Sequence, residues 1–251
     1  MTRISFVITT GGTNDIMLNG IIDSIESQNI PEYEILIVGH LYTTIKRKNT
    51  KHIPFDESVY EHVILHGQTG KWTTRKKNIG VQESKYDVCV VMHDSLKFLD
   101  GWYQGFLEFG LNWDICVHQC ILINGVRGDG WRILKSYPGL PNHCMIPYDL
   151  DDFVQYSGIQ GSYVMVKRDV WLKYPMDENL LWGMEEDVEW SRRVVPNCIV
   201  KCNPKSIVQY MKPRPDDPNH AIDVQTMNNL EPFWNQLRAC KIKNYRLVRE
   251  R

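Results

Sequence analysis

The chain has 251 residues, and its 29 lysine and arginine residues nearly balance its 30 aspartate and glutamate residues, for a formal net charge of -1. This length suits one large α/β domain or two small ones, and the lack of a basic surplus disfavours bulk binding to nucleic acid. The seven cysteines form no CxxC pair, which argues against a disulfide framework or a zinc ribbon and suits a reducing compartment.

The first half of the chain alternates predicted strands with predicted helices. An apolar run at Ile4–Thr10 precedes a helix whose apolar residues recur at i, i+3, i+4 and i+7 from Leu18. Further elements are predicted as strands at Tyr33–Gly39, His62–Gly67 and Asp87–Met92 and as a polar helix at Thr73–Ser84. Continuous apolar strands separated by helices predict a mainly parallel sheet with helices on both faces.

The second half is less regular. Strands are predicted at Asp114–Asn124 and Gly161–Lys167, two short helical pieces follow, and a helical tail begins near Asp223. Between the two strands, Gly125–Tyr156 is rich in Gly, Pro, Asp and aromatic residues without a period, which is typical of a functional loop. No repeat or linker interrupts the chain, so we expect a single domain.

Polar residues gather where the predicted parallel strands end. The first, second and fourth strands run into TTGGTND, IVGH and VMHDS. Because ligands of such sheets bind outside the carboxyl ends of the strands, we expect these three loops to converge on one crevice. His93, Asp94 and Ser95 also fit a plain strand-end turn, in which short polar side chains bond nearby backbone amides.

Four segments together resemble the family 2 glycosyltransferases and the wider GT-A fold. They are FVITTGGTND with a helix ending in SIESQ, TTRKKNIGVQESKYD, VVMHDS, and GSYVMVKRDVWLKYPMDENLLWGMEEDVEWSRR. The resemblance implies an α/β, Rossmann-like, mixed and mainly parallel central sheet flanked by helices. We expect one glycosyltransferase domain at 1–251, with a nucleotide-binding half at 1–100, an acceptor and catalytic half at 101–222, and a helical tail at 223–251.

The implied activity is transfer of a hexosyl group from a nucleotide-diphosphate sugar to a hydroxyl group of a glycan or another acceptor. An inverting, metal-assisted reaction and a UDP-sugar donor are favoured, with no nucleic-acid partner. The family's acidic residue after the second strand is replaced here by Gly39-His40, a departure that counts against uridine. The alternatives are a retaining transferase or nucleotidyltransferase of the same fold, and a non-catalytic module that binds nucleotide-sugars or carbohydrates.

The resemblance also implies a divalent cation, Mn²⁺ or Mg²⁺, which would neutralise the leaving diphosphate. The family's metal motif has two acidic positions, whereas this chain has only Asp94, flanked by His93 and Ser95. Asp94 is the expected ligand, since Mg²⁺ often uses one or two protein carboxylates. His93 is a second candidate ligand, because imidazole also binds transition metals.

The donor-binding residues implied by the resemblance lie mainly in the first half. Thr10, Gly11 and Gly12 would let the backbone approach the base and ribose. Arg75 and Asn78 lie on the helix before the metal strand and are placed near the donor, since arginine binds phosphate well. The alternatives are an ordinary β-to-α turn for the first group and a solvated helix face for the second.

The acidic cluster Glu185–Asp187 supplies the expected catalytic group. The family's ED pair maps onto Glu186 and Asp187, and successive helical residues turn by about 100°, so both cannot face one point. We predict that Asp187 is the base and that Glu186 binds the acceptor or caps the helix; a helix cap alone is the alternative. Gly161, counted among the donor-binding residues, opens a strand beside this crevice. Candidate sugar-stacking faces are Trp131, Trp182 and Tyr163.

The N-terminal segment has the pattern of a strand and not that of a signal peptide, and no apolar run approaches the roughly 20 residues of a membrane span. A cytoplasmic protein is therefore expected. The tail KIKNYRLVRER has five basic residues and one acid. This composition favours a solvated helical end, with peripheral contact to an anionic membrane as the alternative.

Overall fold

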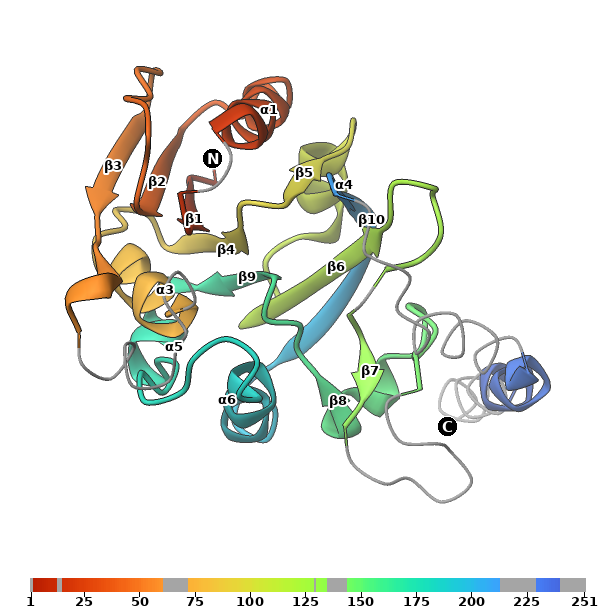
Figure 1. Ribbon diagram of the computed structural model, residues 1–251. Helices are drawn as coiled ribbons and strands as arrows, with labels where there is room; N and C mark the ends of the chain where they lie inside the picture. Colours follow the sequence, from red (N-terminus) through yellow and green to blue (C-terminus); the bar gives the residue numbers. More distant parts are fainter. Residues whose placement is uncertain are drawn as a thin grey trace.

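One mixed sheet organises the computed structural model, which describes residues 2–12, 15–60, 72–128, 130–134, 144–212 and 229–239 (Figure 1). Its strands are β1 (Ile4–Thr10), β2 (Tyr33–Gly39), β3 (Thr50–Pro54), β4 (Val88–His93), β5 (Leu96–Phe98), β6 (Ile115–Ile121), β9 (Tyr163–Lys167) and β10 (Val200–Tyr210). They lie in the order β3-β2-β1-β4-β9-β6-β10-β5. The strands β3, β2, β1 and β4 run parallel, whereas β9 runs antiparallel to β4 and β6. Two short strands, β7 (Arg132–Ile133) and β8 (Ser157–Gly158), form a separate antiparallel pair.

Helices cover both faces of this sheet. They are α1 (Asp15–Glu26), α3 (Thr73–Gln82), α4 (Trp102–Phe109), α5 (Arg168–Lys173) and α6 (Glu186–Val194), with 3-10 turns η1 (Glu57–Val59) and η2 (Asp151–Tyr156) and a helix at 231–239. Apolar residues of α1 and α4 belong to one buried cluster, and those of α3, α5 and α6 belong to a second cluster. The predicted sheet with helices on both faces is confirmed.

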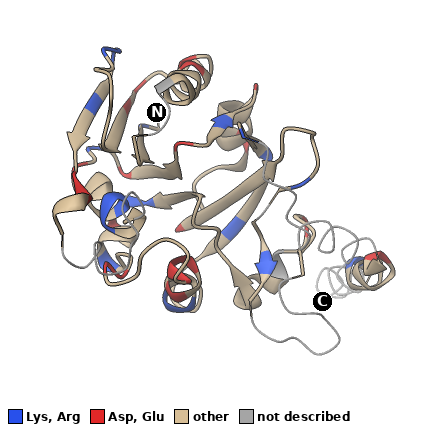
Figure 2. Ribbon diagram, in the orientation of Figure 1, with Lys and Arg blue, Asp and Glu red and all other residues tan. Residues whose placement is uncertain are grey.

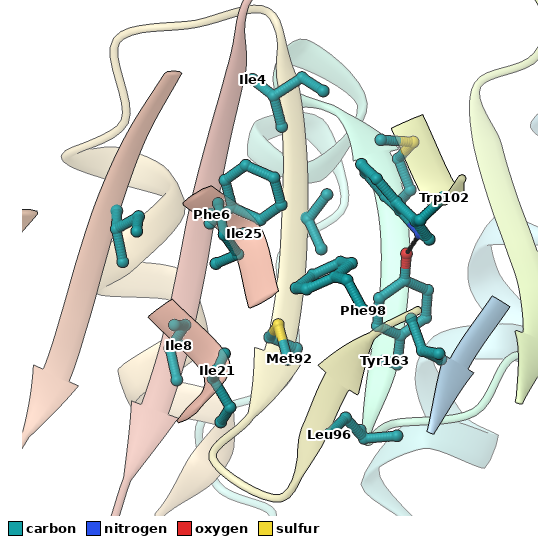
Figure 3. Close-up of a cluster of buried hydrophobic side chains, with 14 of the residues drawn as sticks. Ile4, Phe6, Ile8, Ile21, Ile25, Met92, Leu96, Phe98, Trp102 and Tyr163 are labelled. Atoms are coloured by element: carbon teal, nitrogen blue, oxygen red, sulfur yellow. Dashed lines mark hydrogen bonds between the residues drawn. The ribbon is translucent and has the colours of Figure 1, made fainter. Parts of the chain in front are cut away.

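The strand β1 separates these two clusters. All seven of its residues are buried. Ile4, Phe6 and Ile8 pack into the first cluster, whereas Val7 packs into the second, because successive side chains of a strand point to opposite faces. In Figure 3, Phe6 lies beside Phe98, with the two ring centroids 5.3 Å apart. A strand buried on both faces must be mostly apolar, which explains the run of apolar residues that predicted it.

The ends of the parallel strands meet as predicted. The register pairs Thr10 with Gly39 and Thr9 with His93. The carboxyl ends of β1, β2 and β4 therefore lie at one edge of the sheet, and the polar loops that follow them are neighbours in space.

Five described strands are absent from the predicted elements: the edge strand β3, the long strand β10, and β5, β7 and β8, which have only two or three residues each. β3 is an exposed edge strand of polar sequence, so it lacks the apolar run by which its neighbours were found. β10 is long, but its pairing with β6 is interrupted between Asn203 and Ile207, where Pro204 and Lys205 break the apolar pattern. The strand predicted at His62–Gly67 lies outside the described residues.

Candidate active site

A cavity of about 470 Å³ lies where the carboxyl end of β4 meets the first turn of α6. Its walls also include β7, the turn before β9 and the end of β10. The strand β9 brings the two halves of the chain together, because the His93 amide donates to Ser162 O at 3.0 Å. Four of the predicted catalytic, donor-binding and metal residues line this cavity: His93, Gly161, Glu186 and Asp187.

Asp94 lies between two residues that line the cavity, His93 and Ser95. Thr10 Oγ1 donates to Asp94 Oδ2 at 2.7 Å and accepts a hydrogen bond from the Gly12 amide at 3.0 Å. The carboxylate is thus held by the last residue of β1. Its other oxygen, Oδ1, has no hydrogen-bond partner among the described residues.

The residues at this strand end fit a divalent cation that is bound jointly by the protein and by the phosphates of a substrate. No three His, Cys, Asp or Glu side chains of the described part of the chain cluster as a metal site. Asp94 offers one open carboxylate oxygen, and His93 is its neighbour on the cavity wall. A cation such as Mg²⁺ is often held by one or two carboxylates together with substrate phosphates, and this donor set matches that arrangement.

The glycines after β1 and β2 bring their two loops into contact with each other. Gly39 has φ of 136°, and a Cβ there would lie 2.1 Å from Thr10 O. Gly12 has φ of 84°, and a Cβ there would lie 2.7 Å from His40 Cδ2. Only glycine fits these positions. Gly12 therefore allows the two loops to touch, and Gly11 is exposed. The approach of a nucleoside to this loop stays a prediction.

The helix α3 directs Arg75 and Asn78 toward α5 and the loop after it. Asn78 Nδ2 donates to Met176 O and Glu178 Oε1, and Asn78 Oδ1 accepts from Trp171 Nε1 and the Met176 amide. A side-chain amide offers two donors and two acceptor sites, so all four are used. Arg75 forms an ion pair with Glu178. Both side chains thus support the loop after α5, and their contact with a donor stays a prediction.

The first turn of α6 directs the acidic pair to two different partners. Asp187 Oδ2 accepts a hydrogen bond from the Gly161 amide at 3.0 Å, whereas Glu186 Oε2 accepts one from the Gly183 amide at 3.1 Å. Glu186 is 6% exposed, and burial, together with the neighbouring charge of Asp187, raises its pKa. Asp187 Oδ1 has no hydrogen-bond partner among the described residues. Asp187 therefore presents an open carboxylate oxygen at the cavity wall.

A buried lysine, Lys77, lies behind this pair and is absent from the residues selected by sequence. Its Nζ donates to Gly161 O at 2.6 Å. Burial lowers its pKa to about 8, against the opposing charges of Glu186 and Asp187. The helical period of the sequence could have predicted the burial of Lys77. Val81 follows it by four residues and is buried on the same face of α3.

Further residues of the cavity come from segments that carry no periodic pattern. Arg132 and Lys212 add positive charge to its wall. Acidic residues gather at the start of α6 and basic residues at its end, whereas α3 and β7 carry basic residues (Figure 2). The Tyr210 and Ser162 hydroxyl groups lie 3.0 Å apart, and burial raises the pKa of Tyr210, so its hydroxyl stays protonated at neutral pH.

The three aromatic candidates for sugar stacking have different surroundings. Trp182 lines the cavity and is 45% exposed. Trp131 is fully buried, and Tyr163 is buried with its hydroxyl hydrogen-bonded to His118 Nδ1 at 2.8 Å and to Trp102 Nε1 at 3.1 Å. Trp131 and Tyr163 are therefore core residues, and Trp182 alone of the three is available to a ligand.

Among the described residues, no helix combines the length and apolar character that a membrane crossing requires. The basic segment at 241–251, considered above for membrane contact, lies outside the described residues.

The arrangement of strands and helices is that of the GT-A glycosyltransferases, as predicted. S. aureus TarS 1-349 in complex with UDP-GlcNAc is similar with a TM-score of 0.56 and 10% identity, over 85% of this chain and 60% of that one. GalNAc-T7 with UDP, GalNAc and Mn²⁺ is similar with a TM-score of 0.58 and 12% identity, over 86% of this chain and 45% of that one. The chain thus spans less than two thirds of either protein, and at these identities the similarity shows a shared fold. No protein-family model and no curated protein sequence matches the chain.

Proposed function

We propose that the protein is a family 2-like, inverting glycosyltransferase that moves a hexosyl group from a nucleotide-diphosphate sugar to a hydroxyl group of a glycan or another acceptor. The observation that carries this proposal is the placement of Asp187. One of its oxygens is anchored by the Gly161 amide, and the other is without a partner among the described residues, at the wall of a cavity. A general base requires such a carboxylate within hydrogen-bond reach of the proton that it removes.

In this mechanism the residues of α6 act on the acceptor. Asp187 Oδ1 accepts the proton of the attacking hydroxyl, while the Gly161 amide keeps the carboxylate oriented through Oδ2. Glu186, turned toward the Gly183 amide, shapes the start of the helix and the adjoining wall. Trp182 offers an exposed aromatic face on which a sugar ring can stack.

The donor is assigned to the loops of the nucleotide-binding half, residues 1–100. A UDP-sugar is favoured, which is consistent with the UDP-GlcNAc and UDP named for the proteins of similar fold. Thr10, Gly11 and Gly12 would face the nucleoside, and Asp94 with His93 would hold Mn²⁺ or Mg²⁺. When bound, the cation neutralises the leaving diphosphate.

A second candidate function is a non-catalytic module that binds nucleotide-sugars. The observation that favours it is the single carboxylate, Asp94, at the strand end where the resembled family has two acidic positions. Such a module would bind a donor without consuming it.

Turnover of radiolabelled nucleotide-sugars separates the two candidates. Purified protein is incubated with each donor and a panel of sugar acceptors, with Mn²⁺, with Mg²⁺ or with EDTA. The transferase assignment predicts a labelled product that requires a divalent cation. Donor binding in calorimetry without any product would instead support the binding module, and full turnover in EDTA would contradict the metal assignment.

A further inference from the structure

Two adjacent lysines of α3 are both buried, but they have different partners. Lys76 is 1% exposed and pairs with Glu57 Oε1 at 3.0 Å, and its Nζ also donates to Thr10 O at 3.1 Å. Lys77 is fully buried and donates to Gly161 O at 2.6 Å, yet it forms no ion pair with any described residue. Lys76 thus belongs to an ordinary buried ion pair, whereas the burial of Lys77 requires another explanation.

A buried ammonium group is costly unless nearby groups compensate for its lost hydration. For Lys77 the compensation comes from the Gly161 carbonyl and, at longer range, from Glu186 and Asp187 on α6, with Lys76 on its own helix acting against it. The pKa of Lys77 is lowered to about 8 by burial, so the group still carries its charge at neutral pH. The site therefore retains a positive charge behind its acidic pair.

Gly161 connects this charge to Asp187. Its carbonyl accepts from Lys77 Nζ at 2.6 Å, and its amide donates to Asp187 Oδ2 at 3.0 Å. A Cβ at position 161 would lie 3.0 Å from Asp187 Cβ and 3.2 Å from Oδ2. The absence of a side chain allows α6 to approach the turn, and the turn is hydrogen-bonded on both of its sides.

We propose that Lys77 is a positioning residue of this site: through Gly161 it fixes the direction of the Asp187 carboxylate, and its charge stabilises the ionised forms of Glu186 and Asp187. Lys77 is not part of the cavity wall and acts through these neighbours. Its effect on turnover rests on the proposed function, whereas its effect on the two carboxyl groups is a property of the protein itself.

The first test uses titration of the carboxyl groups and needs no substrate. Carbon-13 NMR follows Glu186 and Asp187 in the wild type, Lys77→Met, Lys77→Gln and the control Lys51→Met, which removes an exposed lysine paired with Glu83. Signals are assigned with Glu186→Gln and Asp187→Asn. Both Lys77 variants are expected to raise the pKa of the Glu186 carboxyl group, because the charge of Lys77 lowers it, and Lys51→Met is expected to leave it unchanged. An unchanged pKa of Glu186 in every folded Lys77 variant would overturn the proposal.

Comparing the two Lys77 variants separates charge from hydrogen bonding. Glutamine keeps a donor for Gly161 without the charge, whereas methionine removes both. If Lys77→Met does not fold, as judged by circular dichroism, the titration is carried out with Lys77→Gln alone. A rise confined to Lys77→Met would show that the hydrogen bond acts and would refute the role of the charge.

The second test measures turnover with a donor and acceptor found in the labelled-donor screen. Lys77→Met is expected to lower kcat about 100-fold, since a displaced reacting group has an effect of that order. The KM for the donor is expected to stay unchanged, and the acid limb of the pH profile is expected to move to higher pH. Wild-type kcat and pH profile in both variants would contradict the positioning role. A wild type without turnover would instead contradict the proposed function, and the titration would still decide the role of Lys77.

Discussion

Asp94 and Asp187 are anchored alike but have different electrostatic surroundings. In each, Oδ2 accepts one hydrogen bond, from the Thr10 hydroxyl or from the Gly161 amide, while Oδ1 has no partner among the described residues. Asp187 also has the adjacent carboxylate of Glu186 and the buried charge of Lys77, which interact with each other.

This difference separates two chemical tasks. A carboxylate that binds a cation together with phosphates gains most of its stabilisation from the ligand when the ligand is present. A carboxylate that accepts a proton requires a fixed direction and a controlled charge before the substrate arrives. The strand end at Asp94 fits the first task, and the start of α6 at Asp187 fits the second.

The largest expected effect comes from removing the proposed base, Asp187. Asp187→Asn keeps the size of the side chain but cannot accept the proton, so kcat is expected to fall by about 10²- to 10⁴-fold. Donor affinity, measured by calorimetry, is expected to stay nearly unchanged. Glu186→Gln is the matched control and is expected to have the smaller effect. A larger loss of kcat in Glu186→Gln than in Asp187→Asn would exchange the roles of the two residues. Unchanged kcat in both variants would show that the pair only caps the helix.

A smaller effect is expected at the strand end of Asp94. Thr10→Val removes the hydroxyl that orients Asp94 and is expected to weaken Mn²⁺-dependent donor binding about 10- to 100-fold. Thr9→Val is the control, because its hydroxyl contacts Met92 O and not Asp94. Calorimetry with donor at several Mn²⁺ concentrations measures the change. Equal donor binding by both variants would contradict the assignment of Asp94 to the proposed cation site.

The support behind the acidic region is tested through stability. Asn78→Ala leaves the Trp171 indole and the Met176 amide without their acceptor, so the free energy of unfolding is expected to fall by about 1–3 kcal/mol. Asn197→Ala, at an exposed position, is expected to change it little. Urea denaturation compares the two. A stable Asn78→Ala protein with reduced donor affinity would instead support the prediction that Asn78 contacts the donor.

The smallest effect concerns pH. The pKa of Lys77 is about 8 in the folded protein, below its ordinary value of 10.5, so above pH 8 the unfolded chain binds more protons than the folded one. The contribution of Lys77 to the free energy of unfolding should therefore rise by about 1 kcal/mol per pH unit just above this value. Urea denaturation of the wild type and Lys77→Met between neutral and moderately alkaline pH measures the difference. A constant difference would show that Lys77 does not titrate in this range.

The strands that organise the sheet were predictable because their environment is uniform. β1 and β2 are buried on both faces, so each is a continuous apolar run, and their observed bounds match the predicted ones. β3 lies at an exposed edge, where burial does not select apolar residues, and its sequence gave no such run. The meeting of the carboxyl ends of β1, β2 and β4 at one edge followed from the parallel order of these strands, although only the end of β4 lines the cavity.

The residues of the site were predictable only where a single segment carries the chemistry. Glu186 and Asp187 are adjacent in sequence, and the turn of a helix separates their directions. Asn78 and Lys77 are also adjacent, but their roles depend on partners 84 to 100 residues away. A run of charged residues on a helix usually faces solvent. On α3, long-range contacts instead bury Lys77 and the neighbouring Asn78.

The configuration of the product tests the central claim most directly. If Asp187 activates an acceptor hydroxyl for a single displacement, the new glycosidic bond has the opposite anomeric configuration to the donor. Proton NMR of the first product formed from a donor of known configuration shows which anomer arises. We predict inversion; retention would contradict the assignment of Asp187 as the base of a single displacement.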